Sequence, residues 1–250
     1  MDIAFSDKFI EALKTAKSVV VSTGAGVSAE SGVPTFRGED GLWKKFRAEE
    51  LATFEAFNAN PGLVWEWYQF RRDIIGKIKP NPGHYAIAEM ANLYDDFHLI
   101  TQNIDNLHRV AGSEDFIELH GNINRNRCVD CGDMNYNKEF KEFPPRCKCG
   151  GRLRPDVVWF GEMLPPGAIE TAFRVSRSCD LLFTVGTSGI VQPAASLPPT
   201  AKQHGAFVVE INIEPSELTF ICDEHIRGKS GEALPIIVDK IKELKGINRE

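Results

Sequence analysis

Near its start the chain reads Val19-Val20-Val21-Ser22-Thr23-Gly24-Ala25-Gly26-Val27-Ser28-Ala29. The β-branched run suits a strand buried on both faces, and glycines directly after a strand let the backbone approach a pyrophosphate. The same pattern also fits a tight strand-to-helix turn without a ligand. No second strand ends in an acidic residue about 20 residues later, as it would in a dehydrogenase. Glu49 and Glu50 lie at that distance, but in a segment without strand character.

Three further apolar runs, at 97–101, 181–185 and 206–211, are each followed at once by small or polar residues. Helix-like segments, such as 84–94 and 166–177, separate the runs. This alternation predicts an α/β fold with a Rossmann-like, mainly parallel sheet. Because such sheets bind ligands outside the carboxyl ends of their strands, we expect the polar segments to line one crevice.

Composition narrows the class of protein. The 250 residues include 29 Lys and Arg against 35 Asp and Glu, a net charge of −6, which gives no reason to expect direct nucleic-acid binding. The N-terminus lacks a basic segment followed by an apolar stretch, and no run approaches the roughly 18 to 20 apolar residues of a membrane span. We therefore expect a cytoplasmic protein without a membrane partner, and a monomer.

Two segments depart from the layered pattern. Residues 37–80 hold no convincing strand and are expected to form a helical lobe inserted after the glycine turn. Residues 123–153 read as loops, rich in Pro, Gly and Cys, and are too few to form a core without a staple. The rest of the chain, 1–122 and 154–250, would then form the Rossmann-like domain.

Four of the six cysteines, Cys128, Cys131, Cys147 and Cys149, lie in the small segment. Four thiolates at such spacing can form a closed, tetrahedral and structural zinc site. The second pair is Cys-x-Cys, a less usual spacing than Cys-x-x-Cys. Oxidised pairs or free thiols are the alternative, which a reducing compartment disfavours.

Two other polar segments are candidates for chemistry. Gln102-Asn103-Ile104-Asp105 directly follows a predicted strand, although an Asn/Asp turn would look the same. His120 also stands at the end of a predicted strand, and a neutral imidazole suits proton removal near pH 7, although a lone histidine is often a packing residue. The other five histidines, His84, His98, His108, His204 and His225, have no comparable setting.

Taken in order, the run from Thr23 to Gly38, Gln102 to Asp105, His120-Gly121, Gly186-Thr187-Ser188 and Asn212 resemble the sirtuin family over essentially the whole chain. The resemblance implies an NAD-dependent protein lysine deacylase, with His120 as general base and Asn103 organising a ribose hydroxyl or water. The implied NAD contacts are Gly24, Ala25, Gly26, Ala29, Glu30, Thr35, Phe36, Arg37, Trp43, Gln102, Asn103, Ile104, Asp105, Gly186, Thr187, Ser188, Asn212, Ile213, Glu214 and Ser230.

In the implied reaction the acyl oxygen attacks the nicotinamide ribose, nicotinamide leaves, and free lysine and O-acyl-ADP-ribose form. Acylated lysine peptides would pair with the segment that holds Val158, Phe160, Gly161 and Glu162 by β-augmentation. Three alternatives remain: an NAD-dependent oxidoreductase, a non-enzymatic reader of ADP-ribose or acyl-lysine, and transfer of ADP-ribose to protein.

Residues 64–78 suggest which acyl group is removed. At helical period they place Arg71 within an apolar stripe, beside Tyr68, while Trp65 and Phe70 fall off the stripe. Snorkelling or a structural ion pair is the plain explanation for such an arginine. The Tyr-x-x-Arg pair, with Ala52 and Thr35, instead resembles the succinyl-preferring sirtuin branch, which implies removal of succinyl or malonyl as well as acetyl groups.

Overall fold

The fold is seen in a computed structural model that describes residues 3–33 and 51–247. Its main sheet has the strand order β3-β2-β1-β7-β8-β9, and every neighbouring pair is parallel. The strands are β1 (Ser18–Thr23), β2 (Asp96–Thr101), β3 (Ile117–Glu118), β7 (Leu181–Val185), β8 (Phe207–Asn212) and β9 (Glu224–Arg227). The predicted α/β class with a Rossmann-like parallel sheet is confirmed.

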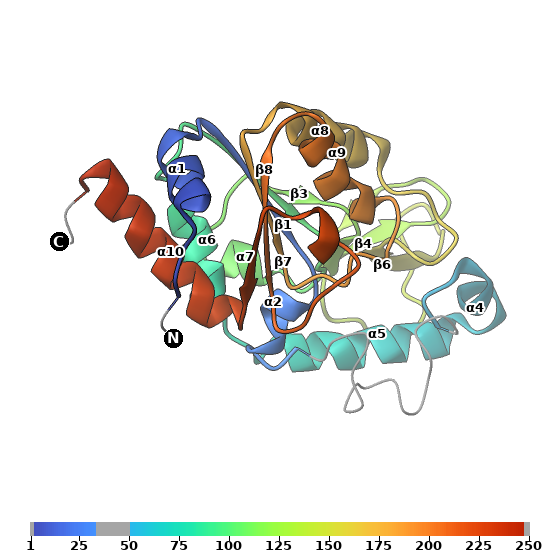
Figure 1. Ribbon diagram of the computed structural model, residues 1–250. Helices are drawn as coiled ribbons and strands as arrows, with labels where there is room; N and C mark the ends of the chain where they lie inside the picture. The colour runs from blue at the N-terminus through green and yellow to red at the C-terminus, as the bar shows by residue number, and fades with distance from the viewer. Residues whose placement is uncertain (1–2, 34–50, 248–250) are drawn as a thin grey trace.

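Helices cover both faces of this sheet (Figure 1). One layer holds α1 (Asp7–Thr15), α6 (Pro82–Met90) and α10 (Ser230–Lys245), and the other holds α8 (Pro166–Ser178) and α9 (Leu197–Gln203). Side chains of β1 alternate between the layers: Val19 and Val21 pack with α1, α6 and α10, and Val20 packs with α8 and α9. The continuous apolar runs of the central strands therefore contribute side chains to two hydrophobic cores, one on each face of the sheet.

Short helices complete the main domain. They are α2 (Gly26–Ala29), α7 (Leu107–Val110), and the 3-10 turns at Ala194–Ser196 and Thr219–Ile221. Local capping sets several boundaries, as where the Ser6 hydroxyl accepts from the Phe9 N–H at 3.2 Å to start α1. Across the described residues, no helix is long and apolar enough to span a membrane.

A helical lobe follows, built from α4 (Phe54–Ala59) and α5 (Pro61–Ile75). Helix α5 begins where the Asn60 side chain accepts from the Leu63 N–H at 3.1 Å, with Pro61 in its first turn. Phe70 is exposed, as its place off the stripe predicted, but Trp65 is fully buried, so its expected position outside the apolar face was wrong. A second surface covers that side of α5: the Trp65 ring lies against Phe140 and Phe143.

That second surface is the cysteine-bearing module, which is less loop-like than expected. It forms a three-stranded antiparallel sheet in the order β5-β4-β6, from β4 (Gly121–Cys128), β5 (Met134–Asn135) and β6 (Leu153–Val157). Arg72 of α5 is buried and donates to the Ile123 carbonyl at 2.7 Å and to Asn126 Oδ1 at 2.6 Å. These bonds, with the Trp65 N–H donated to the Leu153 carbonyl at 2.8 Å, join the lobe to the module.

Candidate active site

The loops that follow β1 and β7 meet at the carboxyl edge of the sheet. The Gly24 N–H donates to the Val185 carbonyl at 2.9 Å, and the Gly26 N–H donates to the Gly186 carbonyl at 2.8 Å. A Cβ on Gly26 would lie 2.7 Å from the Gly186 Cα, and Gly186 itself has a φ of +60°. Only glycine permits this close approach of two backbones, so the glycine turn is fitted to its neighbouring loop.

Asn103, at the end of β2, is held by the same glycine turn. Its side-chain NH2 donates to the Gly24 carbonyl at 3.0 Å and to Ser28 Oγ at 3.2 Å, while its backbone N–H donates to Thr101 Oγ1 at 3.0 Å. Since both amide hydrogens are used within the described residues, Asn103 Oδ1 is left to accept a hydrogen bond. The side chain is buried, so this orientation is fixed before any ligand arrives.

Asp105 is buried two residues further on. Burial raises the pKa of its carboxyl group, and hydrogen bonds from the Leu107 N–H and the Ser28 hydroxyl, with the positive charge of Arg71, act in the opposite direction. The Leu107 bond measures 2.9 Å. Ser28 therefore accepts from Asn103 and donates to Asp105, which links the two side chains of the Gln102–Asp105 segment.

Two buried histidines, His84 and His108, stand behind this network, which no sequence pattern had indicated. His84 Nδ1 accepts from the Asn81 N–H at 3.3 Å, so its hydrogen is on Nε2, which faces Ser28 Oγ at 3.3 Å. His108 Nε2 lies 3.0 Å from Thr23 Oγ1, and the two rings are 4.9 Å apart. Neither histidine stands at a strand end like His120, but both support the side chains that form the crevice.

His120 lies one residue beyond Leu119, whose N–H continues the pairing of β3 with β2. Its Nδ1 is 3.0 Å from the Gln102 carbonyl, which can only accept, so Nδ1 carries the hydrogen and Nε2 has a free lone pair. Burial lowers the pKa of the imidazole, and the Gln102 bond partly offsets this effect. The result is a neutral, oriented imidazole that can accept a proton.

The far side of the crevice is formed after β7 and β8. The Asn212 amide donates to the Thr187 carbonyl at 2.9 Å, and Gln102 Nε2 lies 3.4 Å from Thr187 Oγ1. Ser188 is partly buried and its carbonyl accepts from the Glu217 N–H at 3.3 Å. The loop between β8 and β9 is anchored by Glu210 of β8. Its buried carboxylate accepts hydrogen bonds from the Ser216 and Thr219 hydroxyls of that loop.

Other expected NAD contacts occupy varied positions. Ile213 is exposed, Glu214 pairs with Arg227 at 2.7 Å, and the Glu30 carboxylate accepts from Ser230 Oγ at 3.2 Å at the start of α10. Ala25 directly precedes the short helix α2, and Ala29 is its last residue. Ile104 is buried against the helical lobe. Four expected contacts, Thr35, Phe36, Arg37 and Trp43, lie outside the described residues.

Tyr68 and Arg71 of α5 face the crevice from the lobe. Tyr68 is fully buried, and its hydroxyl accepts from Trp159 Nε1 at 2.9 Å. The Arg71 guanidinium lies 5.8 Å from the centre of the Tyr68 ring and 5.0 Å from that of Trp67. Burial lowers the pKa of Arg71, while Tyr68 and Asp105 favour its charged form. Arg71 thus lies close enough to Asp105 for the two charges to interact.

The expected peptide-binding segment runs alongside. Val158 donates its N–H to the His120 carbonyl and Phe160 donates to the Ala52 carbonyl, both at 2.9 Å, so the segment joins His120 to the lobe. Phe160 is half exposed, Gly161 has a φ of +83°, and both lie on the outer side. The Glu162 carboxylate holds Arg154 and the Trp159 N–H, the latter at 2.8 Å. The hydrogen bonds of Glu162 thus stabilise the conformation of this segment.

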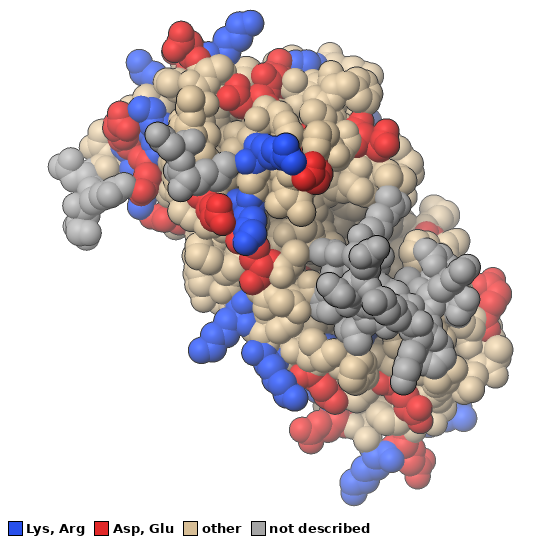
Figure 2. All heavy atoms as spheres, turned by 60° about the horizontal axis from the view of Figure 1, so that its bottom comes forward, with Lys and Arg blue, Asp and Glu red and all other residues tan. Residues whose placement is uncertain are grey.

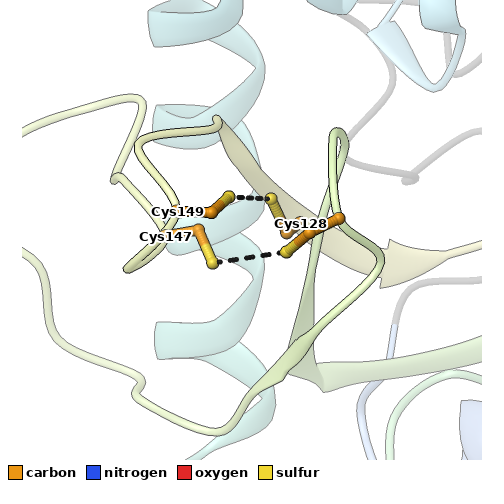
Figure 3. Close-up of side chains that lie close together, drawn as sticks. Cys128, Cys147 and Cys149 are labelled. Carbon is orange, nitrogen blue, oxygen red and sulfur yellow. Dashed lines mark hydrogen bonds between the residues drawn. The ribbon is translucent and has the colours of Figure 1, made fainter.

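The four predicted cysteines converge (Figure 3). Their sulfur atoms all lie within 4.8 Å of one another, with Cys128 and Cys149 at 3.5 Å and Cys131 and Cys147 at 3.8 Å. A tetrahedral zinc with sulfur ligands at about 2.3 Å sets those atoms about 3.8 Å apart, so the cluster fits the metal despite its Cys-x-Cys pair. A Cβ on Gly151, two residues after Cys149, would lie 2.8 Å from Cys128 Sγ, which explains why a glycine stands there.

Charged side chains of both signs are mixed on the surface of the molecule. On the face shown in Figure 2, Lys and Arg side chains are interspersed with Asp and Glu, without a large area of one sign. This distribution agrees with the small net charge of −6.

Comparison with known proteins agrees with this geometry. The model of the Sir2 family matches residues 24–193. An NAD-dependent protein deacylase of Aquifex aeolicus (strain VF5) is 52% identical over 232 residues, which cover 92% of this chain and 97% of that protein. Another, of Pyrococcus furiosus, is 52% identical over 240 residues, which cover 93% and 96% of the two chains.

Solved structures agree over almost the whole length. A Sir2 homologue in complex with NAD superposes with a TM-score of 0.91 at 44% identity, covering 98% of this chain and 96% of that one. Sir2Af2 bound to a myristoylated histone peptide does so with a TM-score of 0.78 at 40% identity, covering 96% and 98%. Because the family model matches more than half of the chain, and relatives above 50% identity match along nearly all of it, this chain belongs to the Sir2 family, the sirtuins.

Proposed function

We propose that the chain is an NAD-dependent protein lysine deacylase. An acylated lysine, NAD and water would give free lysine, nicotinamide and O-acyl-ADP-ribose. One observation carries the proposal most strongly: His120 has its hydrogen on Nδ1 and its free Nε2 in the same crevice as the oriented Asn103. Close relatives named as deacylases, and a neighbour bound to an acylated peptide, support it.

In this reaction His120 would accept a proton, and Asn103 and Asp105 would orient NAD. When bound in the crevice, NAD would supply the ribose carbon at which nicotinamide is replaced by the acyl oxygen. His120 Nε2 accepts a proton from a ribose hydroxyl, which a neutral imidazole of lowered pKa does near pH 7. Asn103 Oδ1 accepts a hydrogen bond from a ribose hydroxyl or a water, and Asp105 accepts from the carboxamide of nicotinamide.

The substrate peptide would lie along residues 158–162. Phe160 is half exposed, and its N–H is already bonded to Ala52, so an extended peptide is expected on the opposite edge of the segment. The acylated lysine would then enter between His120 and the helical lobe. Zinc would stabilise the fold of the cysteine module and take no part in the reaction.

The acyl preference would come from Tyr68 and Arg71. A phenol and a guanidinium three residues apart on one helix can bind the same carboxylate, which succinyl and malonyl groups carry and acetyl lacks. Tyr68 is buried and Arg71 is partly buried, and the small side chain of Ala52, in the same buried cluster as Tyr68, would leave room for the acyl group. We therefore propose that acidic acyl groups are removed at least as well as acetyl.

Mass spectrometry of lysine peptides that carry acetyl, succinyl or malonyl groups, incubated with and without NAD, tests this function. We expect mass loss of the acyl group and release of nicotinamide only when NAD and acylated peptide are both present. Reduction of NAD, read at about 340 nm, would instead indicate an oxidoreductase. Addition of ADP-ribose to the peptide without acyl loss would indicate an ADP-ribosyltransferase.

Replacing Arg71 by Met tests the acyl preference separately. The loss of a charged hydrogen bond should cost desuccinylation about 1.5 to 3 kcal/mol of transition-state stabilisation while deacetylation is spared. Arg174→Met, at an exposed position on α8, is the matched control and should change neither rate. Equal losses on both substrates would show that Arg71 is structural.

A further inference from the structure

Trp159 belongs to the proposed peptide-binding segment, and its ring nitrogen contacts Tyr68. It is 2% exposed, and its ring is held from several directions. The Arg154 guanidinium carbon lies 3.3 Å from a ring centre, and the Phe57 ring lies at 5.3 Å. Its backbone N–H donates to Glu162 at 2.8 Å. With backbone and ring both fixed, the direction of the indole N–H is fixed as well.

The hydrogen bond from this indole determines what Tyr68 can do. An indole N–H can only donate, so the Tyr68 oxygen is the acceptor in the 2.9 Å contact. The phenol's own hydrogen must then point away from Trp159. Burial raises the pKa of Tyr68, so the phenol keeps that hydrogen at neutral pH.

We infer that Trp159 is a specificity-determining residue, whose N–H holds Tyr68 as a hydrogen-bond donor toward a carboxylate on the acyl group. The inference rests on the proposed preference for acidic acyl groups. A phenol free to rotate could turn an oxygen lone pair toward that carboxylate, which is repulsive. An acetyl group has no carboxylate to meet the phenol hydrogen, so the effect of Trp159 is confined to acidic acyl groups.

Trp159→Phe removes the N–H and keeps an aromatic ring. We expect the ratio of kcat/KM for succinyl-lysine to that for acetyl-lysine peptide to fall about 10-fold, mainly through KM for the succinyl peptide. Trp65→Phe is the matched control, because it removes another buried indole N–H, bonded to the Leu153 carbonyl at 2.8 Å. It should lower Tm and leave the ratio unchanged.

Tyr68→Phe and the double variant complete a cycle. If Trp159 acts through the phenol, Trp159→Phe should lower the ratio no further once Tyr68 is Phe. An additive loss, an unchanged ratio in Trp159→Phe, or an equal loss on both peptides would overturn the inference. Should Trp159→Phe not fold, benzothienylalanine at position 159 replaces the N–H by sulfur in a ring of nearly the same shape, with the same expected result.

The proposed function fails in a different way. A wild-type enzyme that releases nicotinamide with acetyl but not succinyl peptide would refute the acidic preference and this inference together. A wild-type enzyme that removes succinyl groups, with a ratio insensitive to the indole N–H, would refute the role of Trp159 alone.

Discussion

Lowering the pH from 7 to 4 should destabilise the folded protein by about 3 kcal/mol through His84 alone. Burial lowers the pKa of this imidazole to about 4, against about 6.5 for an exposed histidine. At pH 7 His84 is mostly neutral in both the folded and the unfolded chain, so small changes of pH there alter the free energy of unfolding little through this residue. Below about pH 6.5 the unfolded chain binds a proton that the folded chain does not, so stability falls as pH falls.

The magnitude follows from the width of that window. Each pH unit between about 6.5 and 4 removes about 1.4 kcal/mol per histidine, which over about 2.5 units gives about 3.5 kcal/mol. Because half of the folded molecules are already protonated on His84 at pH 4, the loss at that pH is reduced to about 3 kcal/mol. His108, whose pKa is lowered to about 3 by burial and by His84, adds a similar loss that extends to lower pH. Because the His84 bond to Ser28 Oγ leads to Asn103, the acid-induced change should begin in the crevice.

Urea unfolding at pH 7.0, 5.5 and 4.5 measures the effect. His84→Gln should lose stability at pH 7 and show a slope smaller than wild type by about 1.4 kcal/mol per pH unit between pH 6.5 and 4. Carboxylates contribute equally to both proteins and cancel in the comparison. The control is His204→Gln at an exposed position, which should keep the wild-type slope. A wild-type slope in His84→Gln would refute the reasoning.

Three further results are expected. Freshly purified protein should hold one zinc per chain by elemental analysis, and Cys128→Ser should lose both metal and native structure; native circular dichroism without zinc would contradict this. His120→Ala should lower kcat/KM by about 10² or more while calorimetry still detects NAD binding, and the wild-type rate should fall at acidic pH as the imidazole becomes protonated. Most of the activity surviving would remove His120 from the role of base. Gly186→Ala should raise KM for NAD, because its Cβ would lie 2.5 Å from the Val27 nitrogen and φ is +60°. An unchanged KM would show that the two loops can separate without cost to binding.

The central strands could be predicted because a strand buried on both faces carries a continuous apolar run. Strand β9 (Glu224–Arg227) escaped notice because it lies at the edge and alternates Glu, His and Arg with a single buried Ile226. Strand β4 reads as a polar loop because its buried positions include Asn126, whose partner Arg72 is far away in sequence. Polar residues buried by mutual hydrogen bonds leave no hydrophobic pattern to recognise.

In the candidate site, too, some residues could be located from the sequence and others could not. Strand-end residues such as Asn103 and His120 could be located because parallel strands bring their carboxyl ends together. His84 could not, since its partners Ser28 and Asn81 meet only when α2 and α6 are packed. Trp65 was misplaced because a helical stripe indicates one buried face, whereas α5 has neighbours on two.

Helix α5 turns Tyr68 and Arg71 toward the crevice, and on an adjacent stripe it offers Trp65 and Arg72 to the cysteine module. The two residues proposed to set the acyl preference therefore lie on the same helix as the residues that contact the cysteine module. Complete unfolding of the cysteine module, as expected on loss of its metal, would therefore remove one of the two surfaces against which α5 packs, and should disturb the crevice as well as the module.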